Sequence, residues 1–230
     1  MNQHLNKAPS AKVGAVLLLI LSLAVVLWAS DRMAAAWQFF AAESITQNMH
    51  KAGAVTDPGL DEAYMRLQKA LARYPSNPDD LSLSGHLKEL RAGQPAVVGR
   101  EQRELLASAA GDYRQALQQR PRWPYGWASL LSSKDKLGQV DEEFVMAIHK
   151  ATELGPWEPA VQIQVLRTGM RHWDELKRSE RALVRSQMTG ALSTQPREAF
   201  ELARFYLRPD LICNAETGQP EIERWCGYFL

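Results

Sequence analysis

Apolar residues recur at helical spacing along most of the chain, and the clearest example is the segment 121–156. Pro124 suits the first position of a helix, where its missing N–H costs nothing, and an apolar stripe follows it. Gly138 ends that helix, and Asp141 suits the N-cap of a second helix, which stops before Pro156. The segment therefore predicts two antiparallel helices joined by a short turn.

The same spacing predicts further helices on both sides of this pair, and no strand signal competes with them. Proline, glycine or a capping residue separates each helix from the next. These helices are expected at residues 33–52, 57–73, 78–90, 100–119, 158–172, 179–192 and 197–207. Asp57 is expected to cap the second of them, and residues 208–230 are expected to form an irregular tail. The predicted fold class is all-α.

The apolar pattern differs near the N-terminus, where residues 13–29 contain no charge. At about 1.5 Å per residue this run spans about 25 Å, which suits the hydrocarbon core of a membrane. Lys7 and Lys12 precede it without any acid, whereas Asp31 and Arg32 cancel just after it. The positive-inside rule then places the N-terminus in the cytoplasm. We therefore predict a single-pass protein of the bacterial inner membrane with a periplasmic C-terminal domain.

A cleaved signal peptide is the alternative, because Ala34 and Ala36 are small residues of the kind that a signal peptidase needs. The anchor is favoured, since the apolar run exceeds the usual length of about 7–15 residues and the alanines lie beyond the charged pair. Trp28 and Trp37 suit the aromatic belt at the outer membrane interface. Trp37 suits equally the first core position of the soluble part.

A short pattern recurs near the ends of four predicted helices. It consists of an Ala, a bulky residue four positions later, an Ala three after that, and a Pro five further on, and the two later copies have Phe144 or Val184 in place of the first Ala. Its copies are Ala63, Leu67, Ala70, Pro75; Ala109, Tyr113, Ala116, Pro121; Phe144, Ile148, Ala151, Pro156; and Val184, Met188, Ala191, Pro196. Small residues let helices approach, the bulky residue fills the space between them, and proline ends each second helix.

With this pattern the chain resembles the tetratricopeptide repeat family, whose period is about 34 residues. Trp127 and Leu130 match the first helix of that repeat, and Gly85 matches the family glycine one unit earlier, but Leu131 replaces a small residue. The resemblance covers about residues 44–196 and implies an α-solenoid, a stack of antiparallel helix pairs. An irregular helical bundle is the alternative, which explains the helices but not the recurring prolines.

A narrower resemblance rests on the anchor, the divergent repeats and the phrases WPYGWASL and ATELGPWEPAVQIQV, which lie between Trp123 and Val165. Together they look like the VpsP-type accessory proteins of bacterial exopolysaccharide biosynthesis. The phrases suit a helix stop, a proline, an aromatic residue and a helix start, and they are not catalytic motifs. The resemblance implies a role in building or exporting a polysaccharide matrix beside protein partners from that machinery.

On this interpretation the chain has five parts: a cytoplasmic N-terminus (1–12), a transmembrane helix (13–30), a juxtamembrane helix (31–57), the helical repeats (58–207) and the tail (208–230). The net charge of +1 and the interspersed charges give no reason to expect nucleic acid as a partner.

Motifs for catalysis are missing from the sequence: there is no H-E-x-x-H, no G-x-S-x-G and no phosphate-binding glycine loop. Three pairs of adjacent acids stand at predicted helix starts, where acids are favoured for structural reasons. They are Asp79-Asp80, Asp141-Glu142 and Asp174-Glu175. We therefore expect no enzyme and no catalytic, cofactor-binding or metal-binding residue.

Cys213 and Cys226 follow the last predicted helix in a part of the chain assigned to an oxidising compartment, so a disulfide is the natural interpretation. Closing a loop of this size would contribute roughly 3 kcal/mol in the chain-entropy picture. Metal binding is the rival interpretation, but two cysteines without a nearby His cannot complete a tetrahedral site, and no C-x-x-C motif suggests redox catalysis.

Stacked helix pairs leave a concave face lined by the first helix of each pair, and such faces bind peptides or proteins. The residues expected at this face are His86, Glu89, Arg122, Trp123, Tyr125, Ser132, Asp135, Arg167 and Arg171. Arg122, Trp123 and Tyr125 suit stacking on a sugar ring or an extended peptide, although Trp123 also suits a cap between two repeats.

The leading interpretation is a membrane-anchored periplasmic scaffold that acts by protein–protein interaction in exopolysaccharide biosynthesis or export, without a cofactor. A glycan-binding or glycan-modifying envelope protein, using the residues around Trp123, is one alternative. An assembly factor of another cell-envelope complex is a second, with the same architecture and a different partner.

Overall fold

The computed structural model describes residues 11–213 and 220–227, and this described part contains helices but no strand. The all-α prediction is confirmed. The chain divides into two compact units, Met1–Pro75 and Ser76–Leu230.

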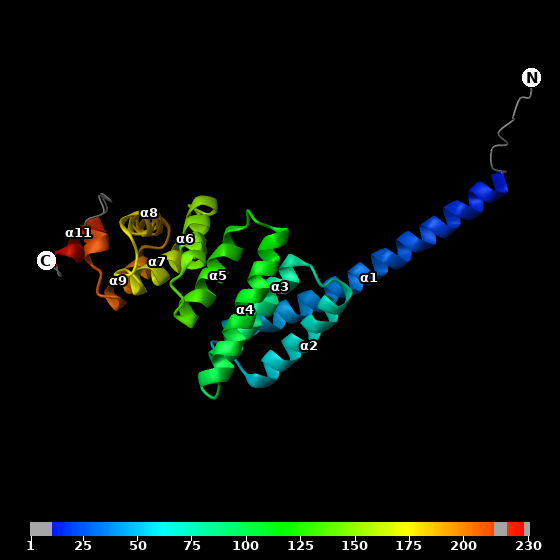
Figure 1. The fold of residues 1–230 in the computed structure, drawn as a ribbon, viewed down its shortest axis with the longest axis horizontal. Helices are drawn as coiled ribbons and strands as arrows, with labels where there is room; N and C mark the ends of the chain where they lie inside the picture. The colour runs from blue at the N-terminus through cyan, green and yellow to red at the C-terminus, as the bar shows by residue number, and fades with distance from the viewer. Residues whose placement is uncertain (1–10, 214–219, 228–230) are drawn as a thin grey trace, which may run out of the picture. The chain divides into compact units, whose positions relative to one another are not determined.

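The first unit pairs α1 (Ala11–Lys51) with α2 (Asp57–Arg73). α1 is one helix of 41 residues, so the predicted membrane helix continues into the predicted juxtamembrane helix without a break (Figure 1). By length and composition, it is the one helix in the described ranges that is able to cross a membrane.

Beyond its apolar run, α1 packs on α2 through a face of mostly small side chains. Ala35, Ala42 and Met49 are buried on this face. The same helix turns Trp37 outward, and this residue is 71% exposed. The interpretation of Trp37 as a core residue is therefore wrong, because the neighbouring alanines take the buried positions.

The N-terminus of α2 is capped by Thr56, whose side-chain oxygen accepts a hydrogen bond from the N–H of Gly59 at 3.3 Å. Asp57, the predicted cap, lies instead in the first turn, where its charge suits the positive end of the helix dipole. The prediction is wrong by one residue, because the extended backbone at Thr56 lets its hydroxyl reach the free N–H groups.

The second unit holds the remaining helices of the described chain. They are α3 (Pro78–Ala92), α4 (Gly99–Gln119), α5 (Pro124–Leu137), α6 (Glu142–Leu154), α7 (Pro159–Arg171), α8 (Arg178–Thr194), α9 (Pro196–Phe205), α10 (Asp210–Cys213) and α11 (Pro220–Cys226). Asp141 caps α6 by accepting from the N–H of Phe144 at 3.0 Å, and Gly138 ends α5 with φ of 67°. Both predictions from the segment 121–156 are thus confirmed.

The four copies of the recurring pattern form the ends of α2, α4, α6 and α8. The three residues of each copy that precede the proline are all buried, each 2% exposed or less. The residue before each proline has φ between −143° and −130°, and its N–H bonds the carbonyl of the Ala four positions back. These closing residues are Tyr74, Arg120, Gly155 and Gln195. All four helices therefore end by the same local geometry, and the following proline prevents continuation.

Helices α3, α5, α7 and α9 lie side by side in that order, because each packs on the next (Figure 1). Glycines allow close contact within the pairs. A Cβ atom on Gly85 of α3 would lie 2.8 Å from the ring of Tyr113, and one on Gly169 of α7 would lie 2.3 Å from Val184. Both neighbours belong to the recurring pattern, so the first helix of these pairs presents glycine to the pattern of the second.

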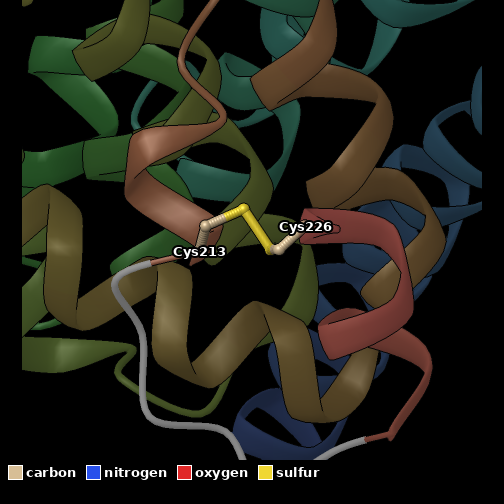
Figure 2. The surroundings of a disulfide bond; sticks show 2 residues. All are labelled: Cys213 and Cys226. Carbon is tan, nitrogen blue, oxygen red and sulfur yellow. A yellow bond between two sulfur atoms is a disulfide. The ribbon is translucent and has the colours of Figure 1, made fainter. Parts of the chain in front are cut away.

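The C-terminal tail contains the short helices α10 and α11 and is not wholly irregular as predicted. A disulfide between Cys213 and Cys226 joins them, with 5.5 Å between the Cα atoms (Figure 2). α10 also packs on α8 and α9, where Leu211 and Ile212 are buried. This burial explains the helical turns that the composition of the tail does not predict.

Candidate functional site

The face formed by α3, α5, α7 and α9 carries most of the predicted binding residues. His86 and Glu89 come from α3, and His86 is half-buried there. α5 provides Ser132 and Asp135, and α7 provides Arg167 and Arg171. The fold joins several of them in two polar networks and a pocket.

The first network connects α3 to α5 around Glu89, whose side chain is 7% exposed. Its carboxylate accepts hydrogen bonds from Ser133, from Ser132 at 3.4 Å and from Lys136 at 2.7 Å. Lys136 balances the buried charge, which is otherwise costly. Ser133 and Lys136 are not in the predicted set, although Lys136 lies four positions after Ser132 and so on the same helix face.

The second network connects α5 to α7 around Asp135, whose side chain is 5% exposed. One carboxylate oxygen accepts from Arg171 at 3.0 Å, and the other lies 2.9 Å from Nε2 of His172. Arg171 also donates to the hydroxyl of Tyr206, just after α9, at 3.2 Å. The pairing of Asp135 with Arg171 agrees with their placement on one face, whereas His172 and Tyr206 are not in the predicted set.

The contacts of the second network favour the positively charged form of Arg171. Burial lowers the pKa of Arg171, but the hydrogen bond to Tyr206 and the charge of Asp135 outweigh burial and raise the pKa above its ordinary value. The other ring nitrogen of His172 lies 2.8 Å from the carboxylate of Glu175. Both contacts of the ring are hydrogen bonds only when it carries two protons. The network therefore holds helices α5, α7 and α9 in one arrangement.

A pocket of about 360 Å³ lies on α7 and α9, one helical turn from Arg171. Its lining residues are Arg167, Glu198, Glu201, Leu202, Arg204 and Phe205. Arg167 lies 3.9 Å from Glu198, and both side chains are more than 40% exposed. The pocket thus combines an apolar part with charged groups of both signs at its rim.

Two large apolar side chains stand exposed at the end of α9. Phe205 is 75% exposed and Leu207 is 84% exposed. Leu207 has φ of 55°, and the next N–H, from Arg208, bonds the carbonyl of Ala203 at 2.7 Å. Glycine is the usual residue at this left-handed position after a helix, because a side chain there costs about 1 kcal/mol. Leucine therefore occupies a position where neither packing nor backbone geometry favours it.

The predicted aromatic group lies at the other end of α5, away from Asp135. Tyr125 donates a hydrogen bond to the carboxylate of Glu158, which raises the pKa of the tyrosine. Trp123 is half-buried, with its ring 6.5 Å from that of Tyr125 and 5.9 Å from the guanidinium of Arg120. Arg122 is exposed beside them. The fold therefore does not bring these three predicted residues together with the polar networks.

Trp157 is a further exposed aromatic residue, outside the predicted set, at 78% exposure. It directly precedes Glu158, the partner of Tyr125, and the backbone of Gly155 packs closely on Pro124. The two connections before α5 and α7 are therefore neighbours. The sequence does contain a signal for this exposure. In GPWEP, Trp157 lies between two prolines that favour a turn, and a residue in such a turn lies outside the helices.

Within residues 11–213 and 220–227, no group of three or more His, Cys, Asp or Glu side chains is arranged to hold a metal ion. The metal interpretation of Cys213 and Cys226 is wrong, because these two cysteines are bonded to each other.

Comparison of the chain with protein-family models, curated proteins and solved structures found no match. Function is therefore inferred from the residues themselves.

Proposed function

We propose that the chain is a membrane-anchored scaffold that binds a protein partner at the end of α9. The observation that carries this proposal is the exposure of Phe205 and Leu207 beside the α7–α9 pocket. A large exposed apolar residue at a strained backbone position is typical of a binding site, since stability alone would select glycine there. The partner is a protein segment with an apolar side chain for the pocket and charged residues for its rim.

The proposed architecture is a tetratricopeptide-like α-solenoid. Its supports are the common closing geometry of α2, α4, α6 and α8 and the row of helices α3, α5, α7 and α9. In such a stack the row of first helices offers the binding face. The two polar networks then serve to fix that face, because each of them joins neighbouring helices of the row.

The proposed location is the bacterial inner membrane, with the N-terminus in the cytoplasm and residues 31–230 in the periplasm. The uncharged run 13–29, preceded by Lys7 and Lys12, supports the orientation. The disulfide between Cys213 and Cys226 supports an oxidising compartment for the C-terminal part.

The proposed partners are components of an exopolysaccharide synthesis or export machine. This part of the proposal rests on the resemblance carried by the phrases around Trp123 and Trp157. Those phrases cover the start of α5, the end of α6 and the start of α7, and Trp123 and Trp157 lie in the connections before α5 and α7. They therefore support a role in exopolysaccharide synthesis or export. The proposed partner-binding surface at the end of α9 rests on different residues.

A strain lacking the gene, complemented with variants of the full-length chain, tests the proposal. We expect Phe205→Glu to reduce both exported polymer and co-purification of a polysaccharide assembly component, because a charge would enter the apolar contact. Met146→Glu is the matched control, since Met146 is also apolar and 45% exposed but lies on α6. Normal polymer output in the deletion strain, or equal effects of the two variants, would contradict the proposal.

Direct glycan binding is a second candidate function, and the exposure of Trp157 next to the Tyr125–Glu158 pair favours it. Exposed aromatic faces beside hydrogen-bonding side chains suit the flat, hydroxyl-rich surface of a sugar ring. We expect a neutral oligosaccharide to quench intrinsic tryptophan fluorescence in the wild type and not in Trp157→Ala. Equal quenching in both proteins would rule out this surface.

A further inference from the structure

Three arginine side chains surround one indole ring in the second unit. The guanidinium carbons of Arg181, Arg185 and Arg208 lie 5.6, 5.1 and 4.9 Å from the ring centroid of Trp173. Trp173 itself is 5% exposed. The buried ring thus serves as a packing platform for three cationic side chains, and cation–π attraction contributes to holding them there.

Acidic side chains neutralise this cluster only in part. Arg208 pairs with Asp174 at 3.1 Å, but the aspartate side chain is 93% exposed, so water screens the attraction. Arg181 donates to the backbone carbonyl of Trp173 at 2.8 Å, which adds no negative charge. Arg185 is exposed and has no carboxylate partner among the residues that the structure describes. The cluster therefore keeps an excess of positive charge.

The surrounding sequence increases that excess. Lys177 and Arg178 are exposed at the start of α8, the helix that carries Arg181 and Arg185. The nearby acids have partners elsewhere, because Glu175 lies 2.8 Å from His172 and the buried Glu180 faces His149 at 3.6 Å. Since the whole chain carries a net charge of only +1, this surface is a local concentration of positive charge. Mutual repulsion among these groups favours the binding of an anion.

Arginine is the side chain best suited to carboxylates, because its planar fork donates two parallel hydrogen bonds. The buried indole offers no free face for stacking, so the site recognises charge rather than a sugar ring. Three guanidiniums also offer more N–H donors than one carboxylate can accept, so the cluster suits several acidic groups along a polymer.

We propose that Arg181, Arg185 and Arg208 bind the carboxylates of an acidic polysaccharide. The choice of a polysaccharide rests on the proposed function, whereas the preference for an anionic ligand rests on the cluster.

The test uses the full-length chain in detergent micelles and fluorescein-labelled polygalacturonate, followed by fluorescence anisotropy. We expect binding that weakens as salt is added and that unlabelled polygalacturonate displaces. Methyl-esterified polygalacturonate, which has the same backbone without the charges, is expected not to compete. Arg185→Gln should weaken binding roughly tenfold, because one charge-assisted fork is lost, and Arg185→Lys should weaken it less.

Arg185 is the residue of choice because it is exposed and its side chain lies over the Trp173 ring without a carboxylate partner in the described structure. Arg103→Gln, an exposed arginine on α4, is the matched control and should bind as the wild type does. Equal competition by the methyl ester, or wild-type affinity in Arg185→Gln, would overturn the proposal. Glycerol phosphate competing at a lower charge concentration than polygalacturonate would overturn it in favour of a phosphate headgroup.

Failure here is distinguishable from failure of the scaffold function. Phe205→Glu should leave polygalacturonate binding unchanged, and Arg185→Gln should leave co-purification of the protein partner unchanged.

Discussion

Nη1 of Arg171 on α7 lies 3.0 Å from Oδ2 of Asp135 on α5, a side chain that is only 5% exposed. We expect Asp135→Asn to lower the free energy of unfolding by about 1–3 kcal/mol, because a buried network loses its charge balance while the partly exposed Arg171 regains some hydration. Chemical unfolding of the full-length chain in detergent, followed by tryptophan fluorescence, measures this change.

Two comparisons control the experiment on Asp135. Glu104→Gln removes an exposed ion pair with Arg100 on α4 and should leave the unfolding midpoint unchanged. The double variant with Arg171→Gln should lose less stability than the sum of the single variants, because the two side chains interact. Simple additivity would show that the contact between Asp135 and Arg171 contributes nothing.

Leu207 leads to a prediction in which stability and function change in opposite directions. We expect Leu207→Gly to raise the free energy of unfolding by about 0.5–1 kcal/mol, because glycine adopts the left-handed backbone without strain. The same change should weaken partner binding, since the exposed side chain is lost. Thermal unfolding and quantitative co-purification measure the two effects.

Leu207→Ala is the matched variant for that experiment. It removes the exposed side chain but keeps a Cβ atom in the left-handed backbone, so partner binding should fall without a gain in stability. If glycine and alanine had the same effect on stability, the strain argument at this position would be wrong.

The close approach of α7 and α8 makes Gly169 sensitive to substitution. A Cβ atom there would lie 2.3 Å from Val184, so Gly169→Ala should lower the free energy of unfolding by about 1–3 kcal/mol through overpacking. A Cβ atom on Gly111 of α4 would meet nothing within 4 Å, and Gly111→Ala should instead raise the free energy of unfolding by about 0.5–1 kcal/mol. Urea unfolding of both variants measures the contrast, and effects of the same sign would contradict the packing described for α7 and α8.

The disulfide should stabilise the C-terminal tail in particular. Replacing Cys213 and Cys226 by Ser should cost up to roughly 3 kcal/mol of tail stability in the chain-entropy picture. α11 should then become sensitive to chymotrypsin, which can cleave after Trp225, whereas the chymotrypsin site at Leu211 in α10 should remain protected longer because Leu211 and Ile212 are buried. Limited proteolysis with and without reductant checks this, and cleavage of α10 first would contradict it.

Many of the helix boundaries follow from residues that favour the start or the end of a helix. Pro78, Pro124 and Asp141 mark helix starts by mechanisms that act within one turn, and the structure has helices starting at or directly after all three. The recurring pattern similarly indicates which side chains are buried, because small and bulky residues at fixed spacing define one helix face.

For the candidate site, the sequence predicts which helix face a residue lies on, but not which residue of another helix it contacts. Asp135 and Arg171 belong to faces that the spacing identifies, but the pairing with His172 and Tyr206 depends on how α5, α7 and α9 pack, which no local pattern encodes. Leu207 gives no signal, because leucine is not a residue that marks a left-handed turn. The interpretation of Trp37 as a core residue is wrong for a related reason, because an aromatic side chain suits a protein core and a membrane interface equally.

Asp80 on α3 gives the chain a specific dependence on pH. The residue is 1% exposed, one carboxyl oxygen accepts from Asn77 at 3.0 Å, and the other has no hydrogen-bond partner in the described structure. Burial and the neighbouring charge of Asp79 raise its pKa to about 6 from an ordinary 3.8, against the opposing effect of the Asn77 hydrogen bond. Between these two values the folded state holds a proton that the unfolded state has released.

The sign of the effect follows from that proton. Because the folded state binds more protons between about pH 4 and pH 6, the free energy of unfolding should fall as pH rises through this range, by about 1–3 kcal/mol. In the Asp80→Asn variant the side chain at this position cannot ionise, so its free energy of unfolding should lack this decrease. The difference in unfolding free energy between the variant and the wild type should therefore grow from pH 4 to pH 7 and then stay constant. All other titrating groups are common to both proteins, so a difference that does not change with pH would show that Asp80 ionises normally in the fold.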